Sequence, residues 1–417
     1  MRILRICLRV PYPLNEGSSI EAFNTTRLLA SRGHAITMVA FEGTEIDPTD
    51  AEPLRQFCDL HVIPFHGKNS VLNIARGVIE RTPVNYIKYR DRRMLNKCLE
   101  LLKERLFDVV VIDHTILGWY AHQIRQHSSV PIVLRFHDAH TLIWERWVQN
   151  QSNPIKRALG WQQYKFIRRY ERDLALSSNL CLMIGTRDAQ IVQSLAPSAL
   201  IRFVPAGIDV DHYRPAISPP EPGSILYLAS HYRWHPNWDA VNWLYQTIMP
   251  IVWQRVPNAK LYITGKDTLP EMQTWTADGR VALTGFVPDE RSIIDNSSVV
   301  VIPMRLGAGI KLKLLTAFSS GKAVVSTTIG AEGVPEIRNG EHLLIADESS
   351  SFADAIVSLL KGTSLRKNLE ENGRALVCQH YDWNVIGSMW ESALAAVVLN
   401  GEQAASVSSP AIVVESI

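Results

Sequence analysis

Two lysines and two glycines within seven residues are the first candidates for chemistry in this chain of 417 residues. The stretch 305–313 reads RLGAGIKLK, so Gly307 and Gly309 lie just before Lys311 and Lys313. Glycine lets a backbone bend sharply and approach a ligand closely. Amide groups at a helix start and nearby ammonium groups bind anions. The pattern therefore predicts a phosphate or diphosphate site; the other interpretation is that both lysines are solvated.

The elements around this loop can be predicted from the same stretch. Residues 299–304 (VVVIPM) are apolar and rich in β-branched side chains, as in a strand buried on both faces of a parallel sheet. A helix over 311–320, ended by Gly321, and a second strand over 322–328 follow. A lysine in the first turn of a helix lies at the positive end of the helix dipole, which destabilises the helix by about 0.3–1 kcal/mol for each lysine. A bound anion would offset this, which favours the anion site.

Length and composition indicate a two-domain globular enzyme. A chain of 417 residues exceeds one ordinary core and predicts two domains of about 200 residues each. The net charge of +2 gives no reason to expect nucleic acid as a partner. The sequence has no apolar run of the roughly 18 residues that span a bilayer, and the apolar part of the N-terminus is too short for a signal peptide. A cytoplasmic protein is therefore expected.

The cysteines are odd in number, scattered, and without a C-x-x-C spacing. This pattern predicts buried free thiols in a reducing compartment, with neither disulfides nor a zinc site. The five residues are Cys7, Cys58, Cys98, Cys181 and Cys378.

The chain opens with a βαβ pattern. A strand over 2–10, a loop over 11–19, a helix over 20–33 and a strand over 35–41 are expected. The single Gly17 in that loop argues against the G-x-G-x-x-G fingerprint and hence against a dinucleotide-dependent oxidoreductase. Further strands are predicted over 60–64, 109–113, 130–136 and 180–184, and a basic helix over 155–176.

A proline-rich segment separates two such halves. Residues 216–223 (AISPPEPG) are the predicted linker between an N-terminal domain, 1–215, and a C-terminal domain, 224–382. A last helix over 383–399 is expected to pack back on the N-terminal domain, and the tail 400–417 to be disordered. Ligands of such folds bind at the carboxyl ends of the strands, here in the cleft between the halves. The other expected elements of the second half are strands over 224–229, 260–264 and 281–284 and helices over 238–256, 290–296, 351–360 and 364–377.

Three runs of sequence carry a family resemblance. They are VPAGIDVDHYRP at 204–215, LTGFVPD at 283–289, and 301–347 with GAGIKLK, GKAVVSTTIGAEG and GEHLLIAD. In these runs, and over about 8–382, the chain resembles the GT-B glycosyltransferases, and among them the retaining, nucleotide-sugar-dependent hexosyltransferases of family 4. The resemblance implies an α/β fold of two Rossmann-like domains facing across a cleft. It also implies a donor bound mainly by the second domain, an acceptor bound mainly by the first, and no metal or cofactor.

The resemblance assigns roles to the basic residues. Lys311 and Lys313 would stabilise the charge that grows on the departing diphosphate. Arg233, in the loop after the first strand of the second domain, would be another such cation, with a solvated arginine as the alternative. The donor would also meet the backbone of the glycine loop, which comprises Gly307, Ala308, Gly309 and Ile310.

In the first half, His137 matches a histidine that in the family contacts the transferred sugar. It ends a predicted strand, and His140 and Glu145 are nearby polar alternatives. Gly17 and Ser18 match the loop that in similar proteins lies under the donor phosphates, where relatives commonly have two glycines.

The chain departs from the family at two glutamates. Many members have a pair separated by seven residues that binds the donor sugar and the nucleotide ribose, and the matching residues here are Ala308 and Thr316. Neither can be an anionic acceptor, so donor affinity or nucleotide choice is expected to differ. Glu332, in the loop after the next strand, is expected to take over part of the role. The departure also leaves open a catalytically silent GT-B subunit; a nucleotide-sugar epimerase on the same fold is a further alternative.

The expected activity is transfer of a hexose from a nucleotide-diphosphate sugar to a glycan or lipid-linked acceptor with retention of configuration. Two basic stretches in the first half, 88–105 and the helix over 155–176, bear on the acceptor. A basic helix with interleaved aromatic residues favours anionic headgroups and hence peripheral contact with a membrane. The alternative is a solvated helix face balanced by neighbouring acidic residues.

Overall fold

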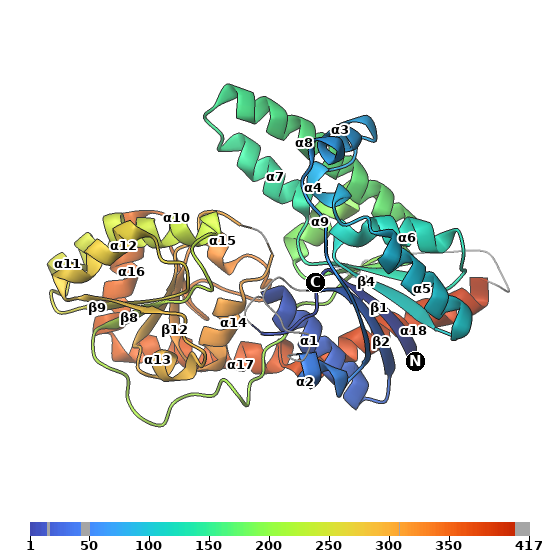
Figure 1. Cartoon of the computed structure of the whole chain (residues 1–417). Helices are drawn as coiled ribbons and strands as arrows, with labels where there is room; N and C mark the ends of the chain where they lie inside the picture. Colours follow the sequence, from blue (N-terminus) through green and yellow to red (C-terminus); the bar gives the residue numbers. More distant parts are fainter. Residues whose placement is uncertain (15–16, 43–50, 308, 405–417) are drawn as a thin grey trace. The chain divides into compact units, whose positions relative to one another are not determined.

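The computed structural model describes residues 1–14, 17–42, 51–307 and 309–404, which fold into two compact units. Unit 1 comprises Met1–Pro205 and the chain from Gly387 on, and unit 2 comprises Ala206–Ile386. In each unit a parallel sheet is flanked by helices (Figure 1). This confirms the predicted α/β class with two Rossmann-like units.

The sheet of unit 1 has seven strands in the described part of the chain, in the order β3-β2-β1-β4-β5-β6-β7. Ile3 of β1 pairs with Ile36 of β2 on one side and with Val109 of β4 on the other. The run VVVID of β4 is buried along its whole length, as expected for a central parallel strand. The strands are β1 (Arg2–Cys7), β2 (Ala35–Phe41), β3 (Asp59–Ile63), β4 (Val109–Asp113), β5 (Ile132–Phe136), β6 (Leu180–Met183) and β7 (Ile201–Phe203).

The helices of unit 1 include one long basic helix, α8. It begins at Pro154, and the side chain of Asn153 caps it by accepting hydrogen bonds from the amides of Ile155 and Lys156. The helices are α1 (Gly17–Ser31), α2 (Glu52–Arg55), α3 (Val71–Ile79), α4 (Val84–Ile87), α5 (Arg92–Glu104), η2 (Thr115–Leu117), α6 (Gly118–Arg125), α7 (His140–Gln149), α8 (Pro154–Ser177) and α9 (Thr186–Leu195).

The sheet of unit 2 has six parallel strands among the described residues, in the order β10-β9-β8-β11-β12-β13. The central strand β11 pairs Val299 with Ile225 of β8 and with Ala323 of β12. The strands are β8 (Ser224–Tyr227), β9 (Lys260–Thr264), β10 (Val281–Gly285), β11 (Val299–Ile302), β12 (Ala323–Ser326) and β13 (Leu344–Ile345). The helices are α10 (His235–Trp243), η3 (Leu244–Ile248), α11 (Met249–Arg255), α12 (Pro270–Trp275), η4 (Thr276–Asp278), α13 (Arg291–Asp295), α14 (Leu312–Ser319), α15 (Thr328–Ala331), α16 (Ser349–Lys361), α17 (Thr363–His380) and α18 (Trp383–Ala404), which passes into unit 1.

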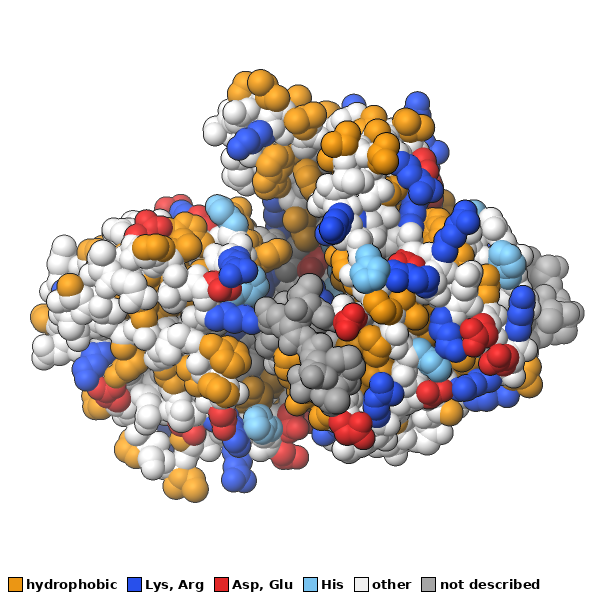
Figure 2. Space-filling model, viewed as in Figure 1, with side chains coloured by type: hydrophobic (Ala, Val, Ile, Leu, Met, Phe, Trp, Pro, Cys, Tyr) orange, Lys and Arg blue, Asp and Glu red, His pale blue; other side chains and the backbone are white. Residues whose placement is uncertain are grey.

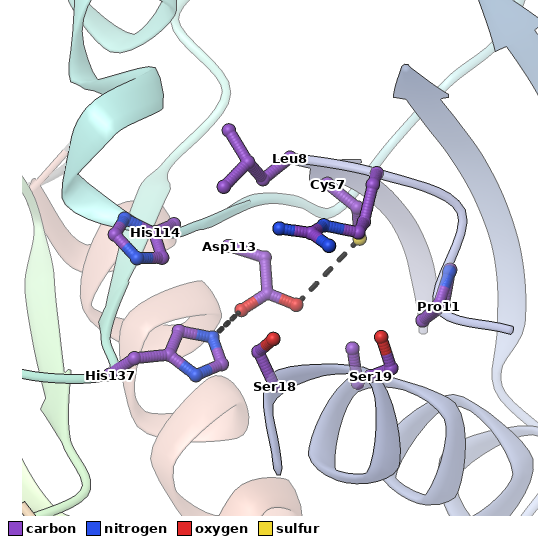
Figure 3. A pocket seen from close by; sticks show the side chains of 10 residues that line it. Cys7, Leu8, Pro11, Ser18, Ser19, Asp113, His114 and His137 are labelled. Atoms are coloured by element: carbon purple, nitrogen blue, oxygen red, sulfur yellow. Dashed lines mark hydrogen bonds and ion pairs between the residues drawn. The ribbon is translucent and has the colours of Figure 1, made fainter. Parts of the chain in front are cut away.

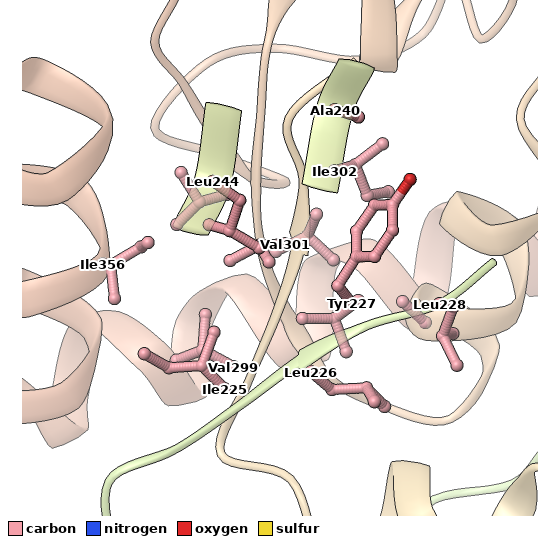
Figure 4. Close-up of a cluster of buried hydrophobic side chains, with 14 of the residues drawn as sticks. Ile225, Leu226, Tyr227, Leu228, Ala240, Leu244, Val299, Val301, Ile302 and Ile356 are labelled. Carbon is pink, nitrogen blue, oxygen red and sulfur yellow. The ribbon is translucent and has the colours of Figure 1, made fainter. Parts of the chain in front are cut away.

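Apolar side chains from the strands and their covering helices form one core in unit 2 (Figure 4). Val299 and Val301 of β11 and Ile225 of β8 are inaccessible to solvent. Leu244 and Ile356 lie in the same cluster and come from the helices that cover the sheet. This core fixes the end of β11, from which the glycine loop begins.

Two predicted elements of unit 2 differ from the structure. The single helix expected over 238–256 is wrong, because a π-helical segment, η3, separates α10 from α11. Pro250 lies in the first turn of α11, where its missing N–H breaks the regular hydrogen-bond ladder. The strand expected over 322–328 ends at Ser326, since the Thr327 hydroxyl accepts from the Gly330 amide (3.0 Å) and caps α15.

The boundary between the units lies after Pro205 and not after Pro215 as predicted. Residues 206–215 belong to unit 2 because their backbone is bound there. The Ile208 amide donates to the Tyr381 carbonyl (2.8 Å), and the Ser319 hydroxyl donates to the Tyr213 carbonyl (2.6 Å). The proline-rich residues 216–223 predicted where the linker lies, but these hydrogen bonds decide that residues 206–215 belong to unit 2.

The last helix is longer than predicted. Helix α18 extends to Ala404, and from Gly387 on it belongs to unit 1. Residues 405–417 of the expected tail lie outside the described residues. All five cysteines are unpaired, as expected, although Cys378 is only partly buried. Within the described ranges, none of the helices is both long and apolar enough to cross a membrane.

Candidate functional site

In unit 2 the glycine loop leads from the buried end of β11 to the first turn of α14. Gly307 and Gly309 have φ of +116° and +65°, a backbone conformation that favours glycine. Lys311 precedes α14, is 8% exposed, and donates from Nζ to the Gly309 carbonyl (2.6 Å). Its ammonium group is therefore held over the loop, as a phosphate site requires. Ala308 lies outside the described residues.

Lys313 is held by residues from two other elements. Its Nζ donates to Oδ1 of Asn237 on α10 (3.2 Å) and lies 4.8 Å from the ring centroid of Tyr227 on β8. Burial lowers the pKa of Lys313, Glu290 raises it and the neighbouring Lys311 lowers it; the net result is a pKa of about 7. The site thus holds two ammonium groups close together in a partly desolvated place.

The loop that follows α15 packs directly on the glycine loop. A Cβ atom at Gly333, whose φ is +99°, would lie 2.8 Å from Cα of Ile310 and 2.9 Å from its amide nitrogen. The loop that contains Glu332 and Gly333 therefore packs against the Gly309–Ile310 backbone through Gly333. Thr316 is buried in α14 and carries no charge. The substitution of Glu332 for the missing glutamates stays a prediction.

Arg233 is placed differently from the two lysines. Its side chain is 79% exposed and pairs with Asp267 (3.2 Å). Asn237 connects this loop with the lysine site, because its Nδ2 donates to the His231 carbonyl (2.9 Å) while its Oδ1 accepts from Lys313. The structure thus favours the solvated interpretation of Arg233.

In unit 1 the carboxyl ends of β1, β4 and β5 meet at a pocket (Figure 3). Asp113 is the last residue of β4, and His137 directly follows β5. His137 Nε2 lies 2.7 Å from Asp113 Oδ1. The lining residues are Cys7, Leu8, Arg9, Pro11, Ser18, Ser19, Ala22, Asp113, His114 and His137.

Gly17 and Ser18 begin helix α1 and do not form a loop, which corrects the prediction that the helix starts at residue 20. Helix propensity is low at glycine and serine, so sequence placed them in the turn before it. Ser18 still lines the pocket beside His137.

Two buried ion pairs support the histidine. Arg5 donates from Nη2 to Asp113 Oδ2 (2.6 Å), and Arg135 donates from Nη2 to Glu21 Oε1 (2.7 Å). All four side chains are at most 2% exposed. The Trp390 ring of α18 covers both guanidinium groups, with centroid distances of 5.7 and 5.0 Å.

These charges set the protonation of the histidine. Burial lowers the pKa of His137, but the charge and the hydrogen bond of Asp113 outweigh burial, so the net shift is upward. Burial opposes ionisation of Asp113, yet Arg5 and His137 lower its pKa well below the usual range. Asp113 is thereby held as a carboxylate that orients the imidazole.

His114 stacks on His137, with 5.4 Å between the ring centroids and 17° between the planes. Its φ of +110° is strained for a residue with a side chain, and such strain is concentrated at functional sites. Burial, together with His140 and His137, lowers the pKa of His114 well below its usual value. His140 bonds through Nδ1 to the hydroxyl of Tyr86 and does not line the pocket, nor does Glu145.

Glu21, Asp113 and His137 each offer a metal-ligand atom, and these atoms lie within 4.8 Å of one another. However, both carboxylates already bind guanidinium groups, and a divalent cation there would lie against Arg5 and Arg135. The donor set therefore suits an internal ion-pair network better than a metal ion.

Sequence reasoning did not find Asp113, Arg5, Glu21, Asn237 or Tyr227 as members of these sites. Each reaches its partner from a different strand or helix; Arg5 and Asp113, for example, are 108 positions apart. For Arg5 and Asp113 the one available signal was a charged residue in an apolar strand, β1 and β4 respectively.

The chain matches two glycosyltransferase family models. The model described as Glycosyltransferase Family 4 matches residues 17–212, and the model described as Glycosyl transferases group 1 matches residues 223–362. A Klebsiella pneumoniae protein, described as an uncharacterized 44.6 kDa protein in cps region, is 22% identical over 91% of this chain and 96% of its own length. A phosphatidyl-myo-inositol mannosyltransferase of Mycobacterium leprae is 26% identical over 37% of this chain and 42% of its own length.

Solved structures share the fold over nearly the whole chain. Sucrose-phosphate synthase from Thermosynechococcus elongatus superposes with a TM-score of 0.70 at 15% identity, covering 97% of this chain and 100% of that one. Anabaena HepE in complex with UDP superposes with a TM-score of 0.67 at 14% identity, covering 95% of this chain and 100% of that one. TarM superposes with a TM-score of 0.70 at 11% identity, covering 94% of this chain and 99% of that one. With both units matched to glycosyltransferase families and this architecture, the chain belongs to the GT-B glycosyltransferases.

Proposed function

We propose that this glycosyltransferase transfers a hexose from a nucleoside-diphosphate sugar to a hydroxyl group of a glycan or lipid-linked acceptor, with retention of configuration. The observation that carries the proposal is the pair of ammonium groups, Lys311 and Lys313, at the positive-φ glycine loop before α14. Fixed cations in a desolvated place stabilise the charge that develops on a departing diphosphate. The depressed pKa of Lys313 indicates that its ammonium form lacks a sufficient counter-charge, which a diphosphate would supply.

A uridine nucleotide is the first donor to test. Anabaena HepE and the pneumococcal transferase GtfA, which share this fold, are known in complexes with UDP. Thr316 stands where family 4 members commonly have a ribose-binding glutamate, so the chain offers an uncharged group there. Glu332, in the loop that packs on the Gly309–Ile310 backbone through Gly333, is the acidic residue we assign to the donor. A cps-region relative supports a role in polysaccharide biosynthesis.

The proposed reaction needs no side-chain nucleophile. The bond between the anomeric carbon and the phosphate oxygen breaks, and a bond to the acceptor oxygen forms on the same face of the sugar. The acceptor proton passes to the departing phosphate oxygen. Asp113, the carboxylate nearest His137, is held by Arg5 and His137 and is 3% exposed, so it orients the histidine and does not attack the sugar. We assign His137 to contact with the transferred sugar.

The test is a product assay with UDP-hexoses and a panel of acceptors, run on the wild-type chain and on Lys313→Met. Retained linkage stereochemistry is read by NMR of the product. Donor turnover only in the presence of an acceptor, lost in Lys313→Met, is expected. Conversion of the donor without acceptor to its epimer would instead establish the epimerase alternative.

A further inference from the structure

Two arginines of unit 1 are buried with their charges. Figure 2 shows Lys and Arg side chains beside Asp and Glu side chains on the surface of this unit, where Arg2 pairs with Asp108 in contact with solvent. Arg5 on β1 and Arg135 on β5 are instead 2% and 0% exposed. A buried guanidinium group is costly unless both its charge and its N–H groups are satisfied. Each of these two arginines must therefore find its partners within the fold.

The charges around these arginines are unequal once His137 is protonated. Asp113 and Glu21 are the carboxylates of the cluster, whereas Arg5, Arg135 and the imidazolium are three cations. Arg5 and His137 share Asp113, since one binds Oδ2 and the other lies 2.7 Å from Oδ1 (Figure 3). A carboxylate shared by two cations stabilises each of them less than it would stabilise one alone. Another source of negative potential would therefore strengthen the cluster.

Both guanidinium groups lie over the ring of Trp390 on α18. This side chain is 1% exposed, and its ring centroid is 5.7 Å from Cζ of Arg5 and 5.0 Å from Cζ of Arg135. An aromatic ring is negative on its face and attracts a cation, more strongly where water is excluded. The Thr25 hydroxyl and the Val204 carbonyl also accept hydrogen bonds from these arginines, but neither acceptor carries a net charge. Trp390 thus adds to the cluster the negative potential that it lacks.

Contacts on both sides of Trp390 fix α18 on unit 1. Glu391, the next residue, accepts a hydrogen bond from Nη1 of Arg32 (2.5 Å), just after α1. Gly387 lies one turn before Trp390, and a Cβ atom there would be 2.4 Å from Cδ2 of Leu28 on α1. The absence of a side chain at Gly387 therefore lets α18 lie directly on α1. These contacts determine where along the sheet the Trp390 ring is placed.

We propose that Trp390 is a positioning residue for His137. The ring stabilises the charge of Arg5, which leaves Asp113 available to the imidazole and so holds His137 in one orientation at the pocket. This inference rests on the proposed function, in which His137 contacts the transferred sugar. If Trp390 served for packing alone, an aliphatic side chain could replace it without any effect on His137.

The test is the pKa of His137, measured by imidazole NMR of the full chain, which needs no substrate and so is decided independently of the proposed reaction. In Trp390→Leu, Arg5 lacks the ring and draws more strongly on Asp113, so the pKa of His137 should fall toward the usual value of 6.5. Trp390→Phe keeps an aromatic face and should keep the pKa close to that of the wild type. In the product assay, Trp390→Leu should lower kcat by roughly 10- to 100-fold and leave the KM for the donor unchanged.

Two further chains separate the charge of the ring from its packing. A tryptophan fluorinated on its six-membered ring, installed at position 390, keeps the shape of the side chain but withdraws negative charge from the ring face; it should lower the pKa of His137 even if Trp390→Leu does not fold. Leu394→Ala is the matched control, because Leu394 is also inaccessible to solvent on α18 but has no ring. It should lower the free energy of unfolding in urea and leave the pKa of His137 unchanged. A wild-type pKa of His137 in Trp390→Leu or in the fluorinated chain would overturn the proposal, as would an equal fall in Leu394→Ala.

Discussion

Lys313 combines a basic side chain with an environment that disfavours its charge. Its pKa is lowered to about 7 by burial, from 10.5 in an exposed lysine. Between about pH 7 and pH 10.5 the Lys313 side chain is protonated in the unfolded chain and largely neutral in the folded one. The free energy of unfolding therefore rises with pH in this range. Such a residue reduces the stability of the unliganded protein at neutral pH, and a diphosphate can recover that loss on binding.

Replacement of Lys313 by Met should therefore stabilise the unliganded protein. The free energy of unfolding at pH 7 is expected to be higher in Lys313→Met than in the wild type, and the difference should shrink as pH approaches 10.5. Urea unfolding at several pH values measures this. A destabilised Lys313→Met variant at pH 7 would show that the ammonium group has a sufficient counter-charge in the free protein.

The protonation state of His137 is also determined by its surroundings, chiefly by burial and by Asp113. In Asp113→Asn the carboxylate that raises the pKa of His137 is lost while burial persists, so this pKa should fall below the usual histidine value of 6.5. Imidazole NMR signals over a pH titration report it. The substitution also leaves Arg5 without its 2.6 Å partner and should destabilise unit 1 by about 3–5 kcal/mol.

The comparison is with His137→Gln, which removes the imidazole but keeps the Arg5–Asp113 pair. This variant should stay close to the wild type in stability and lose turnover. If Asp113→Asn left the His137 pKa above 6.5, the assignment of Asp113 as the group that raises this pKa would be wrong.

Among the elements, β11, the glycine loop and α14 form the proposed donor site, and the loop after α15 packs on it. Gly333→Ala should shift the Gly309–Ile310 backbone, since the new Cβ would lie 2.8 Å from Cα of Ile310. We expect at least tenfold weaker nucleotide binding, measured by calorimetry.

Gly340→Ala is the matched control for Gly333→Ala. Gly340 also has a positive φ, of +80°, but a Cβ there would meet no atom within 4 Å. Both variants carry the strain of a left-handed backbone conformation, and only Gly333→Ala carries the clash. Equal nucleotide affinities in the two variants would refute the role of the α15 loop.

At the scale of the whole molecule, the sequence predicted what depends on contiguous residues. The apolar β-branched runs predicted most strands of both sheets but not the short edge strands β7 and β13, and the glycine–lysine stretch predicted the loop before α14, because each is a local pattern. Arg5 lies on β1, Asp113 ends β4 and His137 directly follows β5, so their meeting depends on the order β1-β4-β5 of the sheet. The boundary after Pro205 likewise depends on hydrogen bonds to Tyr381 and Ser319 that no local pattern contains.

The central claim is that unit 2 binds the donor diphosphate through Lys311 and Lys313. A calorimetric titration with UDP and UDP-sugars tests it, using the wild type, a Lys311→Ala, Lys313→Ala double variant, and Lys322→Met. Lys322 is a suitable control because it is also buried in unit 2, but its Nζ donates to the Asp295 carbonyl (2.8 Å).

The account predicts binding by the wild type and by Lys322→Met, and at least a hundredfold loss in the double variant, from two charge-assisted hydrogen bonds of about 1.5–3 kcal/mol each. Affinity should fall as pH rises above about 7, because Lys313 must take up a proton on binding. Nucleotide binding of wild-type strength in the double variant would contradict the account.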